Sequence, residues 1–351
     1  MDEKILQTNW DAVKERVSSL KNLSDRACNT WIKPLQLYGI EEDTVIIACE
    51  DFEAKDISYV RKEFQSAFAT NIMALLKEPV KVCFVIAADA WKLKVRIKRI
   101  SDARKNAGIK EEYSFDSYIA GISNKYAHNA ALKIAEDADS IYNPLYIYGD
   151  SGIGKTHLLH AIGNYVLEQE PDTRILYLSA AVYADVYDSS FLGNDCKRNE
   201  IEEKVADVDL LLLDDFDAIV NDTATADSLF YLIKHLREEG KQIVIAGQSK
   251  PAEIRWCEER MYYLLNKGLM VGIEEFDAEL KRFMVKKYMD ACGFRYDQGL
   301  LNQIIDKCPE PVQVIEGKLH EIENIASVDY TNVSELIEEW LVTYDDVQVE
   351  E

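Results

Sequence analysis

The segment Gly149–Thr156 constrains the fold of this chain more than any other feature. It reads Gly-Asp-Ser-Gly-Ile-Gly-Lys-Thr and matches the pattern G-x-x-x-x-G-K-[ST] at every fixed position. The apolar run 145–148 enters it and the helical run 157–167 leaves it. A strand, this loop and a helix in that order form a phosphate-binding loop. We call residues 149–156 the phosphate loop.

The chemistry of phosphate binding explains each type of residue in the phosphate loop. Glycines let the backbone bend so that several N–H groups point at phosphate oxygens, next to the positive end of the following helix. Lys155 supplies a charge for the β- and γ-phosphates, and Thr156 supplies a hydroxyl ligand for Mg²⁺. The sequence therefore predicts binding of ATP or another nucleotide. The expected nucleotide contacts are Gly149, Asp150, Ser151, Gly152, Ile153, Gly154, Lys155, Thr156 and His157.

Two adjacent carboxylates follow a second apolar run. Residues 210–213 are four leucines, and Asp214 and Asp215 come directly after them. We expect Asp214 to hold Mg²⁺ through water, and Asp215 to orient or deprotonate an attacking water. The alternative is a strand that simply ends in solvated acids. Together with the phosphate loop, the pair favours a nucleotide-binding protein of the P-loop class.

The order of apolar runs predicts an α/β fold for the larger part of the chain. Runs at 145–148, 175–178, 208–213 and 242–246 alternate with helical stretches, which is typical of a parallel sheet between helices. After about residue 273 only helical periodicity remains. We predict a nucleotide-binding core over 113–272 and a helical lid with a C-terminal tail over 273–351.

Residues 1–86 predict a smaller α/β domain. Apolar residues recur at helical spacing from Ile5 to Leu20, and two apolar runs at 35–40 and 44–49 indicate a hairpin. A long amphipathic stretch over 52–77 and a strand over 80–86 follow.

Residues 87–112 form a basic linker between these domains in our prediction. Residues 86–112 carry +4 in a chain of net charge −23, and 91–100 alternate basic and apolar residues. Such a strip can touch phosphates or an anionic membrane. The other interpretations are a solvated linker or one edge strand.

Charge and cysteine content exclude several classes of protein. A net charge of −23 argues against binding nucleic acid through the whole surface, because that binding depends on Lys and Arg. Seven scattered cysteines without CxxC or Cys/His spacing argue against a disulfide scaffold or a zinc site. His157 and His160 are better explained by packing than by metal binding. Neither a signal peptide nor a membrane span is apparent, so we expect a cytoplasmic protein without integral membrane association.

Several longer segments resemble one family. Residues 113–128, 142–149, 157–168 and 241–245 are similar to the bacterial replication initiator DnaA, an AAA+ ATPase, and residues 30–35 and 52–56 are similar to its N-terminal domain. The resemblance covers nearly the whole chain. It implies a small KH-like N-terminal domain, an AAA+ core with a helical lid, ATP or ADP with Mg²⁺ as cofactors, and a place in DNA replication.

The resemblance also implies roles for individual residues. Ser123 and Asn124 would lie near the adenine, and Gln248 would occupy the sensor-one position, where it can hold a water or the γ-phosphate. Phe52 and Trp31 would lie in or beside a surface that contacts the replication initiator, the replicative helicase or regulatory proteins. Packing in the domain core is the competing interpretation of Trp31.

The chain departs from the family pattern where the family has arginines. Leu264 stands at the position of the inter-subunit arginine, and Gln313 at that of the lid arginine. Neither side chain can neutralise charge on the γ-phosphoryl group. The nearby candidates for replacing them are Arg255, Arg260, Lys267 and Lys318. The sequence leaves open whether the chain is an ATPase, and it predicts at most slow hydrolysis.

Two further departures concern DNA. Between residues 180 and 207, where the family has its single-strand-binding motif, seven acidic residues outnumber three basic ones. The chain also ends where the family's duplex-binding domain would begin, so we expect no sequence-specific duplex binding.

The leading hypothesis is a DnaA-like ATP/ADP-binding protein that acts in replication initiation or its regulation through protein contacts, as a homo- or hetero-oligomer. The alternatives are an active initiator-type ATPase that assembles on origin DNA, or an inert interaction scaffold derived from DnaA.

Overall fold

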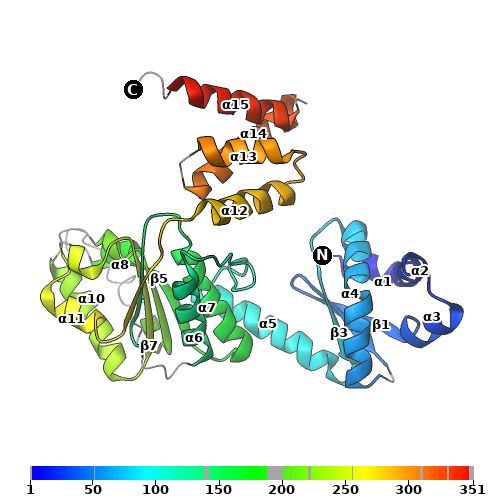
Figure 1. Ribbon diagram of the computed structural model, residues 1–351. Helices are drawn as coiled ribbons and strands as arrows, with labels where there is room; N and C mark the ends of the chain where they lie inside the picture. Colours follow the sequence, from blue (N-terminus) through cyan, green and yellow to red (C-terminus); the bar gives the residue numbers. More distant parts are fainter. Residues whose placement is uncertain are drawn as a thin grey trace. The chain divides into compact units, whose positions relative to one another are not determined.

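The computed structural model describes residues 2–50, 52–137, 142–187, 201, 203–205, 207–219, 223–254, 256–308, 311–329 and 332–347. By their internal contacts the residues form two compact units, Met1–Lys105 and Asn106–Glu351. Each is described by itself (Figure 1). In the described part of the chain, no helix is long and apolar enough to cross a membrane. No disulfide joins the described cysteines.

The first unit is a three-stranded sheet between helices. Strand β1 pairs antiparallel with β2, and β2 pairs parallel with β3, so β2 is central. The predicted hairpin and third strand are confirmed. The elements are α1 (Glu3–Thr8), α2 (Trp10–Leu20), α3 (Asp25–Trp31), β1 (Leu35–Glu41), β2 (Thr44–Cys49), α4 (Ala54–Leu76), β3 (Lys81–Ile86), the 3-10 turn η1 (Ala87–Asp89) and α5 (Ala90–Ala107).

Every residue of β2 is buried because both faces of the sheet are covered. Helix α4 contributes Phe64, Phe68 and Ile72 to the larger core on one face. On the other face, Ile46 and Ala48 of β2 pack against α5.

Our edge-strand interpretation of residues 91–100 is wrong, because this segment belongs to helix α5. The alternation of basic and apolar residues suggested a strand. Ala90, Leu93 and Ile97, however, lie at helical spacing and pack on the sheet, and burial of this stripe selects the helix. The segment is a packed helix and not an unpacked linker.

The second unit contains a five-stranded parallel sheet in the order β5-β6-β7-β4-β8, and it confirms the predicted α/β class. Helices lie on both sides of this sheet (Figure 1). Its elements are α6 (Lys125–Glu136), β4 (Leu145–Tyr148), α7 (Lys155–Gln169), β5 (Ile175–Ser179), α8 (Ala180–Tyr187), β6 (Leu210–Asp214), η2 (Phe216–Ala218), α10 (Thr223–Glu238), β7 (Gln242–Gly247), η3 (Pro251–Glu253), α11 (Glu259–Leu265) and β8 (Leu269–Gly272).

Four of these strands match predicted apolar runs, whereas β8 was not predicted. A helical region then follows, as expected, with its own apolar core. Its helices are α12 (Ala278–Ala291), α13 (Gln298–Lys307), α14 (Val312–Asp329) and α15 (Val333–Val347). We call them the lid helices. Because all strands of the main sheet are parallel, the phosphate loop after β4 and the carboxylates after β6 meet at the same edge.

Candidate nucleotide site

The phosphate loop has the predicted position between β4 and α7. Gly154 precedes the first residue of α7 and has a left-handed backbone with φ 93°. Gly149 also has positive φ, at 150°, and a side chain there would meet the Ile153 Cδ1 atom at 2.3 Å and the Ile273 carbonyl oxygen at 2.5 Å. Glycine at these positions is required by geometry, because an L side chain would be strained and would clash.

Lys155 is held in the loop by its own backbone. Its Nζ atom donates to the carbonyl oxygens of Gly149 at 2.8 Å and Asp150 at 2.6 Å. Burial lowers the pKa of this amine, and the neighbouring carboxylates of Asp214 and Asp217 oppose that effect. The ammonium group is therefore positioned where the loop would receive an anion, and acidic neighbours support its charge.

Asp214 lies at the end of β6 and is only 2% exposed. Its Oδ2 atom accepts from the Thr156 hydroxyl at 2.7 Å and from the Tyr177 hydroxyl at 2.9 Å, and its Oδ1 atom accepts from the backbone N–H of Asp215 at 2.9 Å. These three donors fix the carboxylate beside the hydroxyl of the phosphate loop.

This pair of oxygen ligands fits a magnesium site. A hydroxyl and a carboxylate are hard ligands of the kind that Mg²⁺ prefers, and this ion usually keeps several waters and takes phosphate oxygens as further ligands. Among the residues that the structure describes, no group of three or more His, Cys, Asp or Glu side chains could hold a metal. A metal at Thr156 and Asp214 would thus depend on a bound phosphate to complete its coordination.

Asp215 and Gln248, the two predicted catalytic residues, line the same cavity as the phosphate loop. Burial raises the pKa of the Asp215 carboxyl, and the adjacent Asp214 charge raises it further. Gln248 follows β7, and its backbone N–H donates to Asp217 Oδ2. The position of both side chains agrees with the predicted arrangement, and their roles stay predictions.

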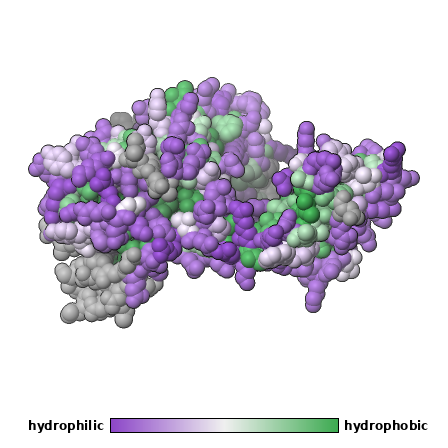
Figure 2. All heavy atoms as spheres, turned by 90° about the horizontal axis from the view of Figure 1, so that it is seen from below, coloured by the Kyte–Doolittle hydropathy of each residue, from purple (hydrophilic) through white to green (hydrophobic). Residues whose placement is uncertain are grey.

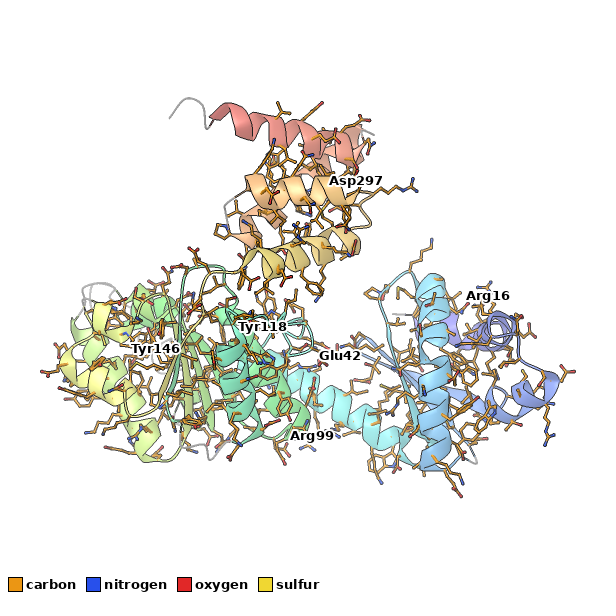
Figure 3. The ribbon with its side chains drawn as sticks, in the orientation of Figure 1. Arg16, Glu42, Arg99, Tyr118, Tyr146 and Asp297 are labelled. Atoms are coloured by element: carbon orange, nitrogen blue, oxygen red, sulfur yellow. The ribbon has the colours of Figure 1, made fainter. Side chains whose placement is uncertain are left out.

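The cavity has a volume of about 530 Å³ and lies between the phosphate loop, residues 113–119 and the lid helices. Figure 3 labels Tyr118, whose ring would be 3.0 Å from a side chain at Gly154. Sequence reasoning missed most of this wall. The missed lining residues are Tyr113, Ser117, Tyr118, Ile119, Phe276, Met284, Lys287, Tyr288, Ala291, Val312 and Glu316.

His157 lines this cavity, but its ring is engaged with the wall. Its Nε2 atom lies 2.9 Å from the Ser114 carbonyl oxygen and 3.2 Å from the Ser117 hydroxyl, and burial lowers its pKa. The ring also packs on Tyr113 and Tyr118, with centroid distances of 4.9 Å and 5.1 Å. His157 therefore connects the first turn of α7 to the cavity wall.

Ser123 and Asn124 are not among the residues that line the cavity. Asn124 is fully buried, and its side chain accepts from the Gly121 N–H at 2.7 Å and donates to the Ile119 carbonyl oxygen at 2.9 Å. The Ser123 hydroxyl is buried and has no hydrogen-bond partner within the described part of the chain. Asn124 thus shapes the turn that carries Ile119, and the predicted adenine contact of both residues remains untested.

The two positions where the family has arginines differ in their surroundings. Gln313 on α14 donates from Nε2 to the carbonyl oxygen of Gly152, so a lid side chain reaches the phosphate loop. Leu264 on α11 is only 6% exposed and packs in the main core. A side chain at position 264 is therefore not presented to a neighbouring molecule.

Two of the candidate replacements for these arginines are engaged in ion pairs. Arg260 pairs with Asp227 and Glu258, and Lys318 pairs with Glu321 at 2.8 Å. Lys267 is exposed, and Arg255 lies outside the described residues, as do residues 188–200 of the acidic segment. Of the described candidates, Arg260, Lys267 and Lys318, none lines the cavity.

Trp31 and Phe52, the predicted partner contacts, meet on the surface of the first unit. Their ring centroids lie 5.7 Å apart, and the Trp31 ring lies 4.6 Å from that of Tyr59. All three rings are at least partly exposed, and Trp31 and Phe52 also pack on the edge of the core. We call them the aromatic cluster. Trp31 is thus partly exposed and also packs on the core.

Comparison with known proteins agrees with this geometry. A family model described as the bacterial DnaA ATPase domain matches residues 109–272. The chain is 27% identical over 340 residues to the chromosomal replication initiator protein DnaA of Lachnoclostridium phytofermentans, which covers 95% of this chain and 75% of that protein.

Solved structures give the same result. Domain III of the Thermotoga maritima replication initiation protein DnaA has a TM-score of 0.59 at 29% identity, over 66% of this chain and 98% of that one. A replication initiator DnaA bound to AMPPCP and single-stranded DNA has a TM-score of 0.56 at 26% identity, over 66% of this chain and 69% of that one. The second unit of this protein therefore contains an AAA+ ATPase domain of the DnaA family.

Proposed function

We propose that this protein binds ATP or ADP with Mg²⁺ and acts through protein contacts in the initiation of chromosome replication or in its regulation. The observation that carries the proposal is the convergence of Lys155, Thr156 and Asp214 at the phosphate loop. These are the three groups that a nucleotide and its metal need. A similar structure binds AMPPCP, a nucleotide with a triphosphate chain, which supports the same use of this loop.

In this proposal hydrolysis is slow or absent. Among the described residues that line the cavity, Lys155 and Lys287 are the only lysines or arginines. Position 313 is glutamine, and Leu264 is buried. An arginine that stabilises the transition state from outside is worth about 10³–10⁵ in rate in related enzymes. Bound nucleotide would then act mainly as a ligand that stabilises one arrangement of core and lid.

The proposed role in replication comes from the relatives. The chain aligns over 340 residues with a chromosomal replication initiator protein. The aromatic cluster is a partly exposed surface of the kind that partner proteins contact, since aromatic residues are enriched in interfaces. We propose that it contacts the initiator, the replicative helicase or a regulatory protein. Weak binding of duplex DNA is expected, because the net charge of −23 opposes it.

A pull-down with the replication initiator and helicase of the same cell tests this proposal. The protein is used without nucleotide, with ADP and with ATP, and is compared with Lys155→Ala and Phe52→Ala. We expect Phe52→Ala to lose the partner under all conditions, and Lys155→Ala to lose only the dependence on nucleotide. Tyr38→Ala, an exposed aromatic on β1 outside the aromatic cluster, is the matched control.

Two results of the pull-down would contradict the proposed contact surface. If neither partner is retained by the wild type, or if Phe52→Ala and Tyr38→Ala behave alike, the aromatic cluster is not the contact surface.

The second candidate is an active initiator-type ATPase that assembles on DNA. The observation in its favour is that Asp215 and Gln248 both line the cavity beside the phosphate loop. Turnover as fast as that of an ordinary AAA+ ATPase, lost in Asp215→Ala and accompanied by ATP-dependent DNA binding, would favour this candidate. The inert scaffold predicts no nucleotide binding at all.

A further inference from the structure

The turn that follows β7 is held by hydrogen bonds on two sides. On one side, the backbone N–H of Gly149 in the phosphate loop donates to the carbonyl oxygen of Gln248 at 3.2 Å. On the other side, the carboxylate of Asp217 accepts from the backbone N–H groups of Gln248 and of Ser249, the latter at 3.1 Å. We call residues 247–249 the β7 turn.

Asp217 differs from the many other carboxylates of this chain. Asp and Glu together number 63, and on the face shown in Figure 2 hydrophilic residues predominate and hydrophobic residues form only small patches. A carboxylate on such a surface has no role by its presence alone. Asp217, however, is half-buried and accepts two consecutive backbone N–H groups. Because hydrogen bonds to an ionised acceptor are strong, this carboxylate fixes the backbone that donates to it.

The core around the β7 turn keeps Asp217 in this position. Its neighbour Phe216 is fully buried, and the ring of Phe216 packs on that of Tyr146 with centroids 5.6 Å apart. Tyr146, labelled in Figure 3, is also fully buried, and its hydroxyl donates to the carbonyl oxygen of Ser249 at 2.9 Å. A side chain at the position of Gly247 would clash with the Tyr146 hydroxyl and with Asp217 Oδ2, so glycine is needed for both groups to reach the turn.

These contacts fix the backbone of Gln248 and leave its side chain available to a ligand. The N–H of Gln248 is bonded to Asp217 and its carbonyl oxygen to the phosphate loop. Its side chain is exposed and lines the cavity together with Lys155 and Asp215, whereas Asp217 is not among the residues that line it. The amide group of a glutamine can donate two hydrogen bonds, and the oxygens of a phosphate accept them.

We propose that Asp217 is a positioning residue that holds Gln248 for contact with the terminal phosphate of ATP, so that the site distinguishes ATP from ADP. This inference rests on the proposed nucleotide function. The side-chain amide of Gln248 donates to an oxygen of the γ-phosphate, a group that ADP lacks. Asp217 contacts neither the nucleotide nor the metal, and it acts only through the backbone of Gln248. The third carboxylate after β6 thus has a different task from Asp214 and Asp215.

Positioning and simple electrostatics predict opposite effects of removing Asp217. Its charge supports the protonated form of Lys155 and repels an anion bound at the same place. If charge were its only role, Asp217→Ala would favour a triphosphate over a diphosphate, because the triphosphate carries the larger negative charge. Loss of positioning weakens the triphosphate relative to ADP, because the hydrogen bond from Gln248 is lost.

Titration calorimetry on the full chain with Mg²⁺ measures the affinities for ADP and for AMPPCP, whose β–γ bridge resists hydrolysis, and the readout is the ratio of AMPPCP affinity to ADP affinity. Hydrogen bonds to charged groups correspond to about 10–150-fold in affinity, so Gln248→Ala should lower this ratio at least about tenfold. Asp217→Ala should lower it at least about fivefold. Asp217→Asn, which keeps one acceptor oxygen, should lower it less. The control Asp227→Ala removes a carboxylate that pairs with Arg260 and does not line the cavity, and it should leave the ratio unchanged.

A double-mutant cycle separates positioning from a general structural role. In the Gln248→Ala background, Asp217→Ala should change the ratio by less than about twofold, because the side chain that it positions is gone. If Asp217→Ala does not fold, Asp217→Asn takes its place in the cycle. An unchanged or higher ratio in the Asp217 variant, or the same loss with and without the Gln248 side chain, would overturn this inference and leave the proposed nucleotide function standing. If the wild type bound neither nucleotide, the proposed function would fail and this inference with it.

Discussion

His160 provides a quantitative test of the packing behind the phosphate loop. It lies on α7 and is 1% exposed. Its ring stacks on Tyr177 with centroids 4.3 Å apart, and its Nδ1 atom lies 3.5 Å from the Lys110 backbone nitrogen, whose N–H donates to it. Burial lowers the pKa of His160 from 6.5 to about 4, and the positive charge of Lys110 acts in the same direction. Tyr177 in turn donates to Asp214, so this histidine supports the metal side of the site.

The pKa values of His160 in the unfolded and folded protein determine the sign and size of the effect of pH on stability. The unfolded chain takes up a proton on this histidine near pH 6.5, whereas the folded protein does so only near pH 4. The stability that depends on the neutral ring is therefore complete above pH 6.5, is lost as the pH falls toward 4, and changes no further below it. The free energy of unfolding loses about 1.4 kcal/mol per pH unit in this window, or about 3 kcal/mol in all.

Histidine-selective NMR measures this directly, because the chain contains only five histidines. The resonance that is missing in His160→Gln belongs to His160. We expect it to titrate near pH 4, and we expect the difference in unfolding free energy between wild type and His160→Gln to shrink between pH 6.5 and 4.5. A titration near pH 6.5, with a difference that does not vary with pH, would refute the reasoning.

Three further substitutions test the site. Asp214→Asn should weaken Mg²⁺-dependent ATP binding by about 10–100-fold and leave metal-free binding nearly unchanged, as measured by calorimetry with and without EDTA. Leu264→Arg should cost at least about 3 kcal/mol of stability, because it places a charge in the core, whereas Tyr263→Arg at the exposed neighbouring position should be tolerated; chemical unfolding compares the two. Gln313→Arg should raise ATP turnover by at least about tenfold, because it adds a cation beside Gly152, and an unchanged rate would argue that the lid does not reach the γ-phosphate.

The sequence predicts the phosphate loop well because its geometry is encoded locally. Two glycines, Lys155 and Thr156 occupy fixed offsets between a strand and a helix, and no distant contact is needed to define them. The end of β6 is equally clear, since four leucines before two carboxylates form a buried strand in most settings.

The features that were missed depend on distant contacts. Strand β8 has four partly buried residues and is defined by its pairing with β4, more than 100 residues earlier. Helix α5 alternates like a strand, and only its packing on Ile46 and Ala48 selects the helical stripe. The aromatic wall of the cavity belongs to a turn without a recognisable motif, which the side chain of Asn124 holds through hydrogen bonds to Gly121 and Ile119.

Titration calorimetry with ATP and ADP in the presence of Mg²⁺ tests the central claim most directly. At about 4 Å and an effective dielectric constant near 20, the Lys155 charge is worth about 4 kcal/mol to a bound phosphate, so Lys155→Ala should weaken binding by about a thousandfold. Lys133→Ala, a surface lysine on α6, is the control. We expect the wild type and Lys133→Ala to bind one nucleotide per chain. Absence of binding at millimolar nucleotide, or equal affinity of Lys155→Ala and wild type, would contradict the account.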